Sequence, residues 1–329
     1  MKRWTLILAL SLLAAVAFLL SIRLGAVTLT GPETLEALFG GGSEEHRIIV
    51  RNLRLPRAIL GLLVGGGLAL AGAVFQALLR NPLAEPYILG ISGGSATGAV
   101  VVLALGLVAA GSWVLPAAAF GGALLAILLV FGVAASADRS LDVRVLLLAG
   151  VVVGAFFTAC IAFVLSVSEA RTVQSAVLWM MGSLAAANWD AVTVAAVYTV
   201  PAAIALVGLA RPLNLMAVGE ETASYLGTNV EGVKKVAYGI ASLLTAAGVA
   251  VAGVIGFVGL IVPHAMRLLV GSDHRILLPV SFLAGATFLT LADVVARLVL
   301  PPSEIPIGVV TAFVGVPLFL VLLRRSLSR

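Results

Sequence analysis

Eight long uncharged stretches alternate with charged segments along this chain. They lie at residues 4–22, 58–79, 86–137, 145–168, 191–210, 236–266, 276–292 and 305–323. A helix needs about 20 apolar residues to cross the hydrocarbon core of a bilayer, so most of these stretches fit one span each. The pattern therefore predicts an all-α integral membrane protein.

Two of the stretches are too long for one helix, and each is expected to fold back as two. At 1.5 Å per residue, a helix of residues 86–137 would be about 78 Å long, and Gly, Ser and Pro interrupt it at 111–116. Residues 236–266 would reach about 46 Å, and four glycines lie between 248 and 259. The pattern predicts about ten transmembrane helices in a single domain, residues 1–329.

The positive charges fit this count when the N-terminus lies in the cytoplasm. Cytoplasmic flanks carry an excess of Lys and Arg, and with ten spans 13 of the 20 fall there. Merging residues 236–266 into one span would move Arg324, Arg325 and Arg329 to the outside. We therefore expect a multi-pass protein of the bacterial inner (plasma) membrane with both termini cytoplasmic.

The composition is also that of a membrane protein. The residues are 61% hydrophobic and 11% charged, with a mean hydropathy of +1.18, whereas soluble domains carry about 25% charged residues. The net charge is +5, but the basic residues are scattered singly, so we expect the lipid bilayer and no nucleic acid as a partner. The single cysteine, Cys160, offers neither a disulfide nor a thiolate metal site.

Two polar segments are long enough to be structured. Residues 25–57 form an outer segment, in which 32–39 is expected to be a short surface helix ended by Gly40-Gly41-Gly42. Residues 211–235 form the largest cytoplasmic loop, in which 219–227 is expected to be a short helix closed by glycine.

The sequence contains no loop for nucleotide phosphates. A search for Gly-x-x-x-x-Gly-Lys-[Ser/Thr] finds nothing, so ATP could act only through another subunit. The histidines His46, His264 and His274 lie on different segments, and no HExxH or CxxC motif is present. We expect no catalytic residue, no metal site and no cofactor bound by this chain.

An enzymatic alternative is an intramembrane serine protease. Gly90-Ile91-Ser92-Gly93 resembles the Gly-x-Ser-Gly of rhomboid proteases, and His264 in a later span could supply a base. Glycine is abundant in this chain, and ten spans exceed the usual rhomboid count. We therefore favour another interpretation, in which the glycines serve helix packing and Pro263-His264 forms a kink with a hydrogen-bonded histidine.

Charges inside spans are informative because each costs about 2.5–3.5 kcal/mol at mid-bilayer unless paired. Asp293 and Arg297 lie four apart on the ninth span, so they form a structural ion pair or leave Arg297 free for an outer partner. An ion-coupled secondary transporter is a second alternative, and it should place acidic relays in mid-span. No Asp or Glu lies in 58–79, 86–137, 145–168 or 236–266.

Several collinear motifs then carry a family resemblance. They are RLPR at 54–57, QALLRNPLAEP at 76–86, WMMG at 179–182, GE at 219–220 with LG at 226–227, GFVGLIVPH at 256–264, DHR at 273–275, DVVAR at 293–297 and PIGVVT at 306–311. Together they resemble the FecCD family of ABC importer permeases. The resemblance implies a type II ABC importer fold, a homodimer around a central path, two cytoplasmic ABC ATPase subunits that bind ATP and Mg, and an extracytoplasmic solute-binding protein.

The resemblance also implies roles for three groups of residues. The coupling helix that sits in a cleft of the ATPase falls on Gly219, Glu220, Glu221, Ala223, Leu226 and Gly227. The outer arginines that pair with glutamates of the binding protein fall on Arg54, Arg57 and Arg297. The cytoplasmic gate falls on Asn81 and Leu83. Ser140-Leu141-Asp142 lies where relatives place a second constriction, but it departs from the small hydroxyl pattern expected there.

Two of these roles also have a physical reason. A short rigid helix can transmit closure of an ATPase dimer as a rigid-body push. An excess of outer arginine opposes the positive-inside tendency, and docking of an acidic partner surface, or binding of lipid headgroups, would explain it.

The resulting hypothesis is a permease that works by alternating access. The family's cargo consists of iron-siderophore, haem or cobalamin chelates, and no residue of the sequence separates these three. We favour a ferric siderophore because it is the commonest cargo. ATP hydrolysis is expected in a separate subunit, so this chain would not be an enzyme.

Overall fold

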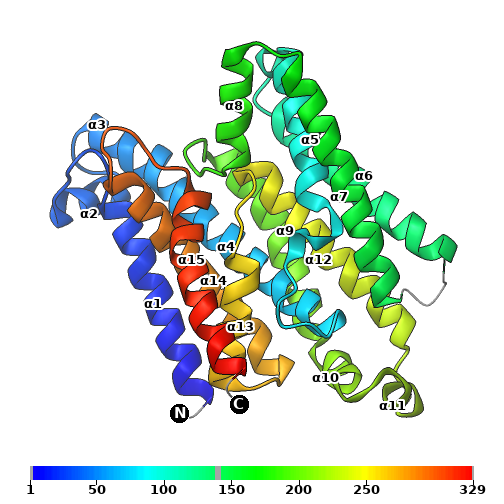
Figure 1. The fold of residues 1–329 in the computed structure, drawn as a ribbon. Coiled ribbons are helices and arrows are strands. Elements are labelled where there is room, and N and C mark those ends of the chain that lie inside the picture. Colours follow the sequence, from blue (N-terminus) through cyan, green and yellow to red (C-terminus); the bar gives the residue numbers. More distant parts are fainter. Residues whose placement is uncertain (1–2, 138–141, 328–329) are drawn as a thin grey trace.

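The computed structural model describes residues 3–137 and 142–327. Within these ranges the regular structure is entirely helical. Figure 1 shows the long helices running roughly alongside one another between two ends of the molecule.

Seven helical stretches in the described part of the chain are long and apolar enough to cross a membrane. They contain α1 (Arg3–Arg23), α4 (Leu55–Leu78), α6 (Val114–Ala137), α7 (Val143–Ser166), α9 (Trp189–Gly208), α12 (Val230–Ala252) and α14 (His274–Leu298). Three shorter apolar helices are α5 (Ile91–Ala104), α13 (Val258–Val270) and α15 (Ile307–Leu327). Together they match the ten predicted segments.

Both expected fold-backs are present. The chain leaves α5 and enters α6 between residues 104 and 114, through the 3-10 turn η3 (Leu107–Ala110). It leaves α12 and enters α13 between residues 252 and 258. Gly106 and Gly253 have φ angles of 67° and 70°, a left-handed conformation that glycine adopts without steric cost.

Helix α4 forms the centre of the bundle and packs against α14, α12, α13 and α9. Its glycines allow close backbone approach, as in other helix pairs in lipid. A Cβ atom at Gly65 would overlap the carbonyl oxygen of Gly285, and one at Gly72 would overlap that of Gly259. On the side of the bundle formed by α5, α6 and α7, a Cβ atom at Gly122 would overlap the carbonyl oxygen of Gly94.

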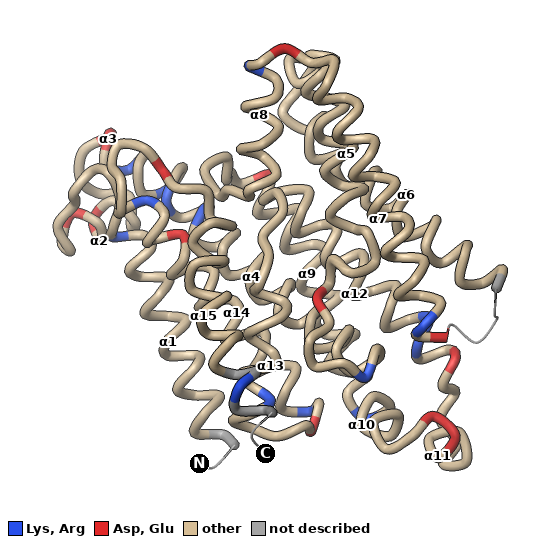
Figure 2. Tube along the Cα trace, viewed as in Figure 1, with Lys and Arg blue, Asp and Glu red and all other residues tan. Residues whose placement is uncertain are grey.

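The two ends of the bundle carry different short helices (Figure 1). One end holds α2 (Gly31–Phe39), α3 (Glu44–Arg47), the π-helix η1 (Ile48–Arg54) and α8 (Ala170–Met180). The other end holds α10 (Ala210–Val218), α11 (Glu220–Tyr225) and both ends of the chain. Charged residues gather at the two ends and leave the middle almost free of charge (Figure 2).

The short outer helix was predicted correctly. α2 begins with a capping box between Thr30 and Glu33, and it ends at Gly40, whose φ is 94°. Hydrogen bonds from the Thr30 amide and hydroxyl lower the pKa of Glu33.

Two other expectations need correction. The segment 211–235, expected to be a loop with one short helix, is helical through most of its length, because α10 and the first turns of α12 lie within it. Helix α8 was not predicted, because Thr172, Gln174 and Ser175 make its sequence too polar to resemble a span. It is amphipathic and its residue Ala176 is buried against the bundle.

Candidate functional site

Arg54 and Arg297 cap the C-terminal end of α1. The last carbonyl groups of a helix lack partners within it, and cations near this end are favoured by the helix dipole. Arg54 donates to the carbonyl oxygens of Ile22 at 3.2 Å and Arg23 at 2.7 Å, and also to that of Val27. Both arginines are buried.

Arg297 reaches the same helix end from α14. Its Nη1 donates to the carbonyl oxygen of Leu24 at 3.0 Å, and its Nη2 donates to the carbonyl and hydroxyl oxygens of Ser21 at 3.2 and 2.9 Å. Its Nε lies 3.1 Å from Asp293 Oδ2. The predicted ion pair on α14 is thus confirmed, and the alternative of an unengaged Arg297 is wrong.

Arg57, one turn along from Arg54, contacts two carboxylates at once. Its Nε and Nη2 donate to Asp293 Oδ1 at 3.0 and 2.9 Å. Its Nη1 and Nη2 donate to the two oxygens of Glu304 at 2.9 and 2.7 Å. The side chain of Asp293 is only 2% exposed, whereas that of Glu304 is 37% exposed.

The three arginines predicted to dock a binding protein therefore lie together. They line one open pocket of about 300 Å³ at the α2–α3 end, and Glu304 lines it too. Arg54 and Arg297 already use their donors within the chain, and their bonds to the end of α1 were not foreseen from the sequence. Arg57 is the member that pairs with a partly exposed carboxylate, Glu304. Docking by this pocket stays a prediction.

The predicted coupling helix is α11, at the opposite end of the bundle from these arginines (Figure 1). Its Glu220 accepts from Lys234 Nζ at 2.6 Å and lies 3.3 Å from Arg80 Nη2. The first contact ties α11 to α12, and the second ties it to the end of α4.

The remaining residues of this segment divide between the core and the surface. Ala223 is buried, while Glu221 and Leu226 are exposed. Gly219 and Gly227 have φ angles of 153° and 82°, so glycine bounds the helix on both sides. The helix is thus anchored along one side and presents an apolar residue, Leu226, on the other. ATPase coupling stays a prediction.

The predicted gate residues Asn81 and Leu83 lie in the segment 81–87, called the gate segment below, which follows Arg80 directly. Asn81 Oδ1 accepts the backbone N–H of Leu83 at 2.9 Å, an Asx turn that fixes the bend before η2 (Pro86–Leu89). The side chain of Leu83 is exposed. Gating by these two residues stays a prediction. Of the second constriction, Ser140 and Leu141 lie outside the described residues, and Asp142 caps the N-terminus of α7.

Two side chains near the end of the gate segment hydrogen-bond to the unwound backbone between α12 and α13. Glu85 Oε1 accepts the backbone N–H of Phe257 at 2.9 Å. The hydroxyl group of Tyr87 donates to the carbonyl oxygen of Ile255 at 3.0 Å and accepts its N–H at 3.2 Å. These side chains replace helical hydrogen bonds that the unwound backbone lacks. Backbone polar groups inside a bilayer need such partners because no water is present there to bind them.

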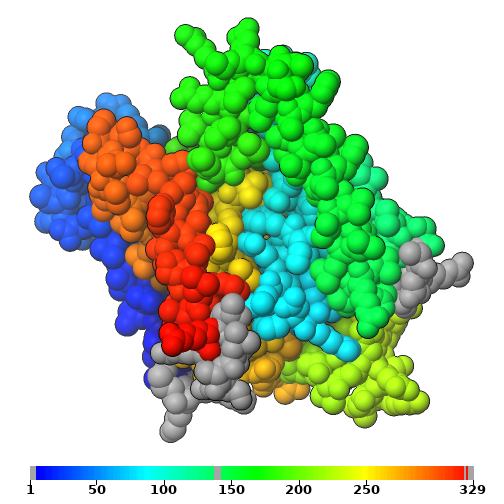
Figure 3. Space-filling model, in the orientation of Figure 1, coloured from blue at the N-terminus to red at the C-terminus, as the bar shows by residue number. Residues whose placement is uncertain are grey.

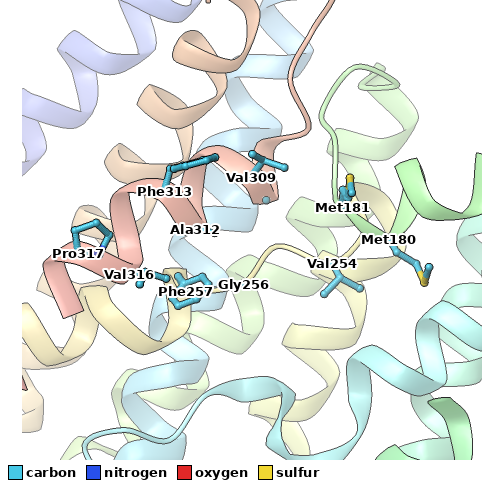
Figure 4. A pocket seen from close by; sticks show the side chains of 11 residues that line it. Met180, Met181, Val254, Gly256, Phe257, Val309, Ala312, Phe313, Val316 and Pro317 are labelled. Atoms are coloured by element: carbon cyan, nitrogen blue, oxygen red, sulfur yellow. The ribbon is translucent and has the colours of Figure 1, made fainter. Parts of the chain in front are cut away.

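An apolar pocket of about 600 Å³ lies beside this break. Figure 4 shows Met180 and Met181 on one side, the α15 side chains on the other, and the unwound segment with Phe257 between them. In the space-filling view, the yellow α12–α13 region is visible from outside beside the red α15 (Figure 3). Sequence reasoning missed Glu85, Tyr87 and Phe257, although the motifs that contain Glu85 and Phe257 were recognised and Tyr87 directly follows the first of them.

The protease alternative finds no support in the geometry. His264 is buried, and neither of its ring nitrogens has a hydrogen-bond partner, so it does not bond to Ser92. The expected hydrogen-bonded histidine at the Pro263 kink is therefore wrong. Among the described residues, no group of three or more His, Cys, Asp or Glu side chains is arranged to hold a metal ion.

Comparison with protein families decides the class of this chain. Residues 12–325 match the FecCD transport family. The chain belongs to this family. Its resemblance to FecCD permeases, inferred from the motifs, is confirmed over nearly its whole length.

Several relatives of this FecCD permease are ABC permeases. The cobalamin import system permease BtuC of Halobacterium salinarum is 45% identical over 285 residues, covering 86% of this chain and 75% of the relative. The ABC transporter permease YvrB of Bacillus subtilis is 40% identical, covering 95% and 91%. The vitamin B12 import system permease BtuC of Salmonella typhimurium is 39% identical, covering 98% and 95%.

Solved structures agree with the family. A metal-chelate type ABC transporter in an inward-facing conformation has a TM-score of 0.88 and 33% identity, covering 98% of this chain and 99% of that chain. PsaBC from Streptococcus pneumoniae has a TM-score of 0.55 at 19% identity, covering 82% and 90%, and shows likeness of fold alone. The chain is thus a multi-pass permease of the ABC importer class.

Proposed function

We propose that this chain forms half of the membrane path of an ATP-driven importer and carries its solute by alternating access. The observation that carries the proposal is the placement of the arginine pocket and α11 at opposite ends of an apolar bundle (Figures 1 and 2). A loaded binding protein docks at the first end, and ATPase subunits act on the second.

We also propose the partners that such an importer needs. A second copy of the chain completes the path, two ABC ATPase subunits bind ATP and Mg beneath α11, and an extracytoplasmic solute-binding protein docks on the arginine pocket. Both chain termini lie at the α11 end, which is then the cytoplasmic face of the plasma membrane. The exposure of Leu226 at this end supports the orientation, because an exposed apolar residue gains by burial against a partner.

The apolar pocket beside α15 is the part of the path that this protomer supplies. Non-helical backbone at membrane depth is tolerated where it is buried in protein or lines a cavity, and residues 253–257 are unwound within an uncharged stretch. Discontinuous helices of this kind mark binding sites in other transporters. An apolar wall with few polar groups contacts a large chelate weakly, which favours release.

The cargo that the relatives favour is cobalamin. Two of the relatives described above are named as cobalamin or vitamin B12 import permeases, and the alignment with one of them covers 98% of this chain. We therefore propose a cobalamin-type corrinoid in place of the ferric siderophore that we favoured on frequency alone. Haem and ferric siderophores are the competitors to test.

Reconstitution tests the proposal directly. The permease is placed in liposomes with its ATPase and binding protein, and uptake of cobalt-57 cyanocobalamin, iron-55 siderophore and haem is measured with and without ATP. We expect ATP-dependent uptake of cyanocobalamin. Uptake driven by an ion gradient without ATP would contradict the importer, and ATP-dependent uptake of only iron chelates would contradict the cargo.

A further inference from the structure

The side chains that hold the break between α12 and α13 come from the gate segment, far away in the sequence. Glu85 and Phe257 are 172 residues apart, yet the carboxylate of the first accepts the N–H of the second at 2.9 Å. Tyr87 makes two hydrogen bonds to Ile255 in the same segment. The gate segment and the break are therefore joined at two successive points.

Phe257 has a backbone conformation that its side chain disfavours. Its φ is 70°, whereas non-glycine residues rarely take positive values. Such a conformation persists only where the surroundings over-determine it, and it is concentrated at functional sites. Here Glu85 fixes the Phe257 amide, and the Phe257 carbonyl accepts the N–H of Ile261 in the first turn of α13 at 2.9 Å.

This backbone conformation sets the position of the Phe257 ring. Phe257 lines the apolar pocket opposite Met180 and Met181 (Figure 4). On α15, Gly315 leaves room for it, because a Cβ atom there would lie 2.9 Å from the Phe257 Cβ. The ring is thus held between α15 and the start of α13 while it faces the cavity.

The other end of the gate segment is anchored as well. Arg80 lies 3.3 Å from Glu220 of α11, so residues 80–87 run from the predicted coupling helix to the wall of the pocket. The segment thus contacts α11 through an exposed ion pair at one end and Phe257 through a backbone hydrogen bond at the other. Its bend is stiffened by Pro82, Pro86 and the Asx turn of Asn81.

We propose that Phe257 is the wall residue that contacts the solute in the path, and that Glu85 is the positioning residue that places it there. This inference rests on the proposed function for the identity of the solute. The position of Phe257 itself rests on the contacts of this chain alone, so the two can be tested separately.

The first test measures the position of Phe257 without transport. Cys160 is replaced by Ser, and Phe257→Cys is then labelled with a maleimide in the detergent-solubilised permease. Adding Glu85→Leu removes the oxygen acceptor, and we expect the labelling rate to change about tenfold. Glu85→Gln keeps an oxygen acceptor and should leave the rate near that of the parent. The labelling rate of Val309→Cys, across the pocket, should be the same with either change at position 85.

The second test measures coupling in the importer reconstituted with its ATPase and binding protein. We expect Glu85→Leu to reduce cyanocobalamin uptake per ATP hydrolysed about tenfold at an ATPase rate close to wild type, and Glu85→Gln to restore it. Phe257→Ala should reproduce the loss, and adding Glu85→Leu to it should cost little more, since both changes affect one contact.

The outcomes separate the two proposals. Equal labelling of Phe257→Cys with Leu, Gln or Glu at position 85 would overturn the positioning role. Normal uptake by Phe257→Ala would overturn the contact with the solute. A wild-type importer that takes up no chelate would overturn the proposed function, while the labelling result would still decide the role of Glu85.

Discussion

Arg57 holds Glu304 through both terminal nitrogens, at 2.9 and 2.7 Å, while its Nε donates to the buried Asp293 at 3.0 Å. One guanidinium group therefore spans a fixed interior carboxylate and a surface carboxylate. In the docking that we propose, a carboxylate of an acidic partner would take the place of Glu304 on Arg57, so docking would exchange one carboxylate for another.

The exchange predicts that neutralising Glu304 strengthens docking. Half-exposed ion pairs contribute up to about 1 kcal/mol, so Glu304→Gln should raise the affinity for the binding protein about two- to fivefold. Biolayer interferometry on the permease in nanodiscs measures this. Glu45→Gln removes the same charge from an exposed position at the same end of the molecule. An equal gain with Glu45→Gln would show that overall surface charge, not release of Arg57, controls docking.

Removing Arg297 should destabilise the fold before it affects docking. The substitution Arg297→Ala leaves Asp293 with one cation and exposes the carbonyl groups of Ser21 and Leu24, and loss of a buried pair costs about 3–5 kcal/mol. We expect a fall of several degrees in the unfolding temperature in detergent. Arg51→Ala, at an exposed arginine of the same region, should leave the temperature unchanged. Equal stability of the two variants would contradict the capping of α1 by Arg297.

The exposed side of α11 should be the ATPase contact. Leu226 is 64% exposed at the end of this helix, and Leu226→Asp would put a charge where the proposed contact buries an apolar side chain. We expect co-purification of the ATPase to be lost while the permease remains folded. Leu35 of α2, 54% exposed at the opposite end, provides the matched Leu35→Asp control. If this control also lost the ATPase, the assignment of α11 would fail.

Adjacent glycines of α6 offer a test of the helix packing. A Cβ atom at Gly122 would overlap the carbonyl oxygen of Gly94 on α5, whereas one at Gly121 would meet nothing within 4 Å. Gly122→Ala should therefore destabilise the protein by about 1–3 kcal/mol through overpacking. Gly121→Ala should be neutral or slightly stabilising, since alanine favours helix by up to about 1 kcal/mol. Thermal unfolding of both variants in the same detergent compares them, and a reversed order would contradict the α5–α6 contact.

The sequence by itself determined the helices that cross the membrane. The number of apolar helices, the two fold-backs, α2 and α11 follow from the lengths of apolar runs and from glycine, proline and capping residues within a few positions. These signals are local, so no tertiary contact is needed to interpret them. The family also followed from motifs such as QALLRNPLAEP, which are local strings of residues.

Only the tertiary structure decided what the polar side chains of the site do. The sequence suggested docking roles for Arg54 and Arg297 and left open an ion pair of Arg297 with Asp293. Only the fold showed that carbonyl groups at the end of α1 engage both arginines. Glu85 belonged to a recognised motif but had no predicted role. The fold places its carboxylate within hydrogen-bond distance of the Phe257 N–H. The length of an apolar run depends only on neighbouring residues, so it can be found in the sequence. The partner of a buried charge depends on which distant helices pack beside it, so it cannot.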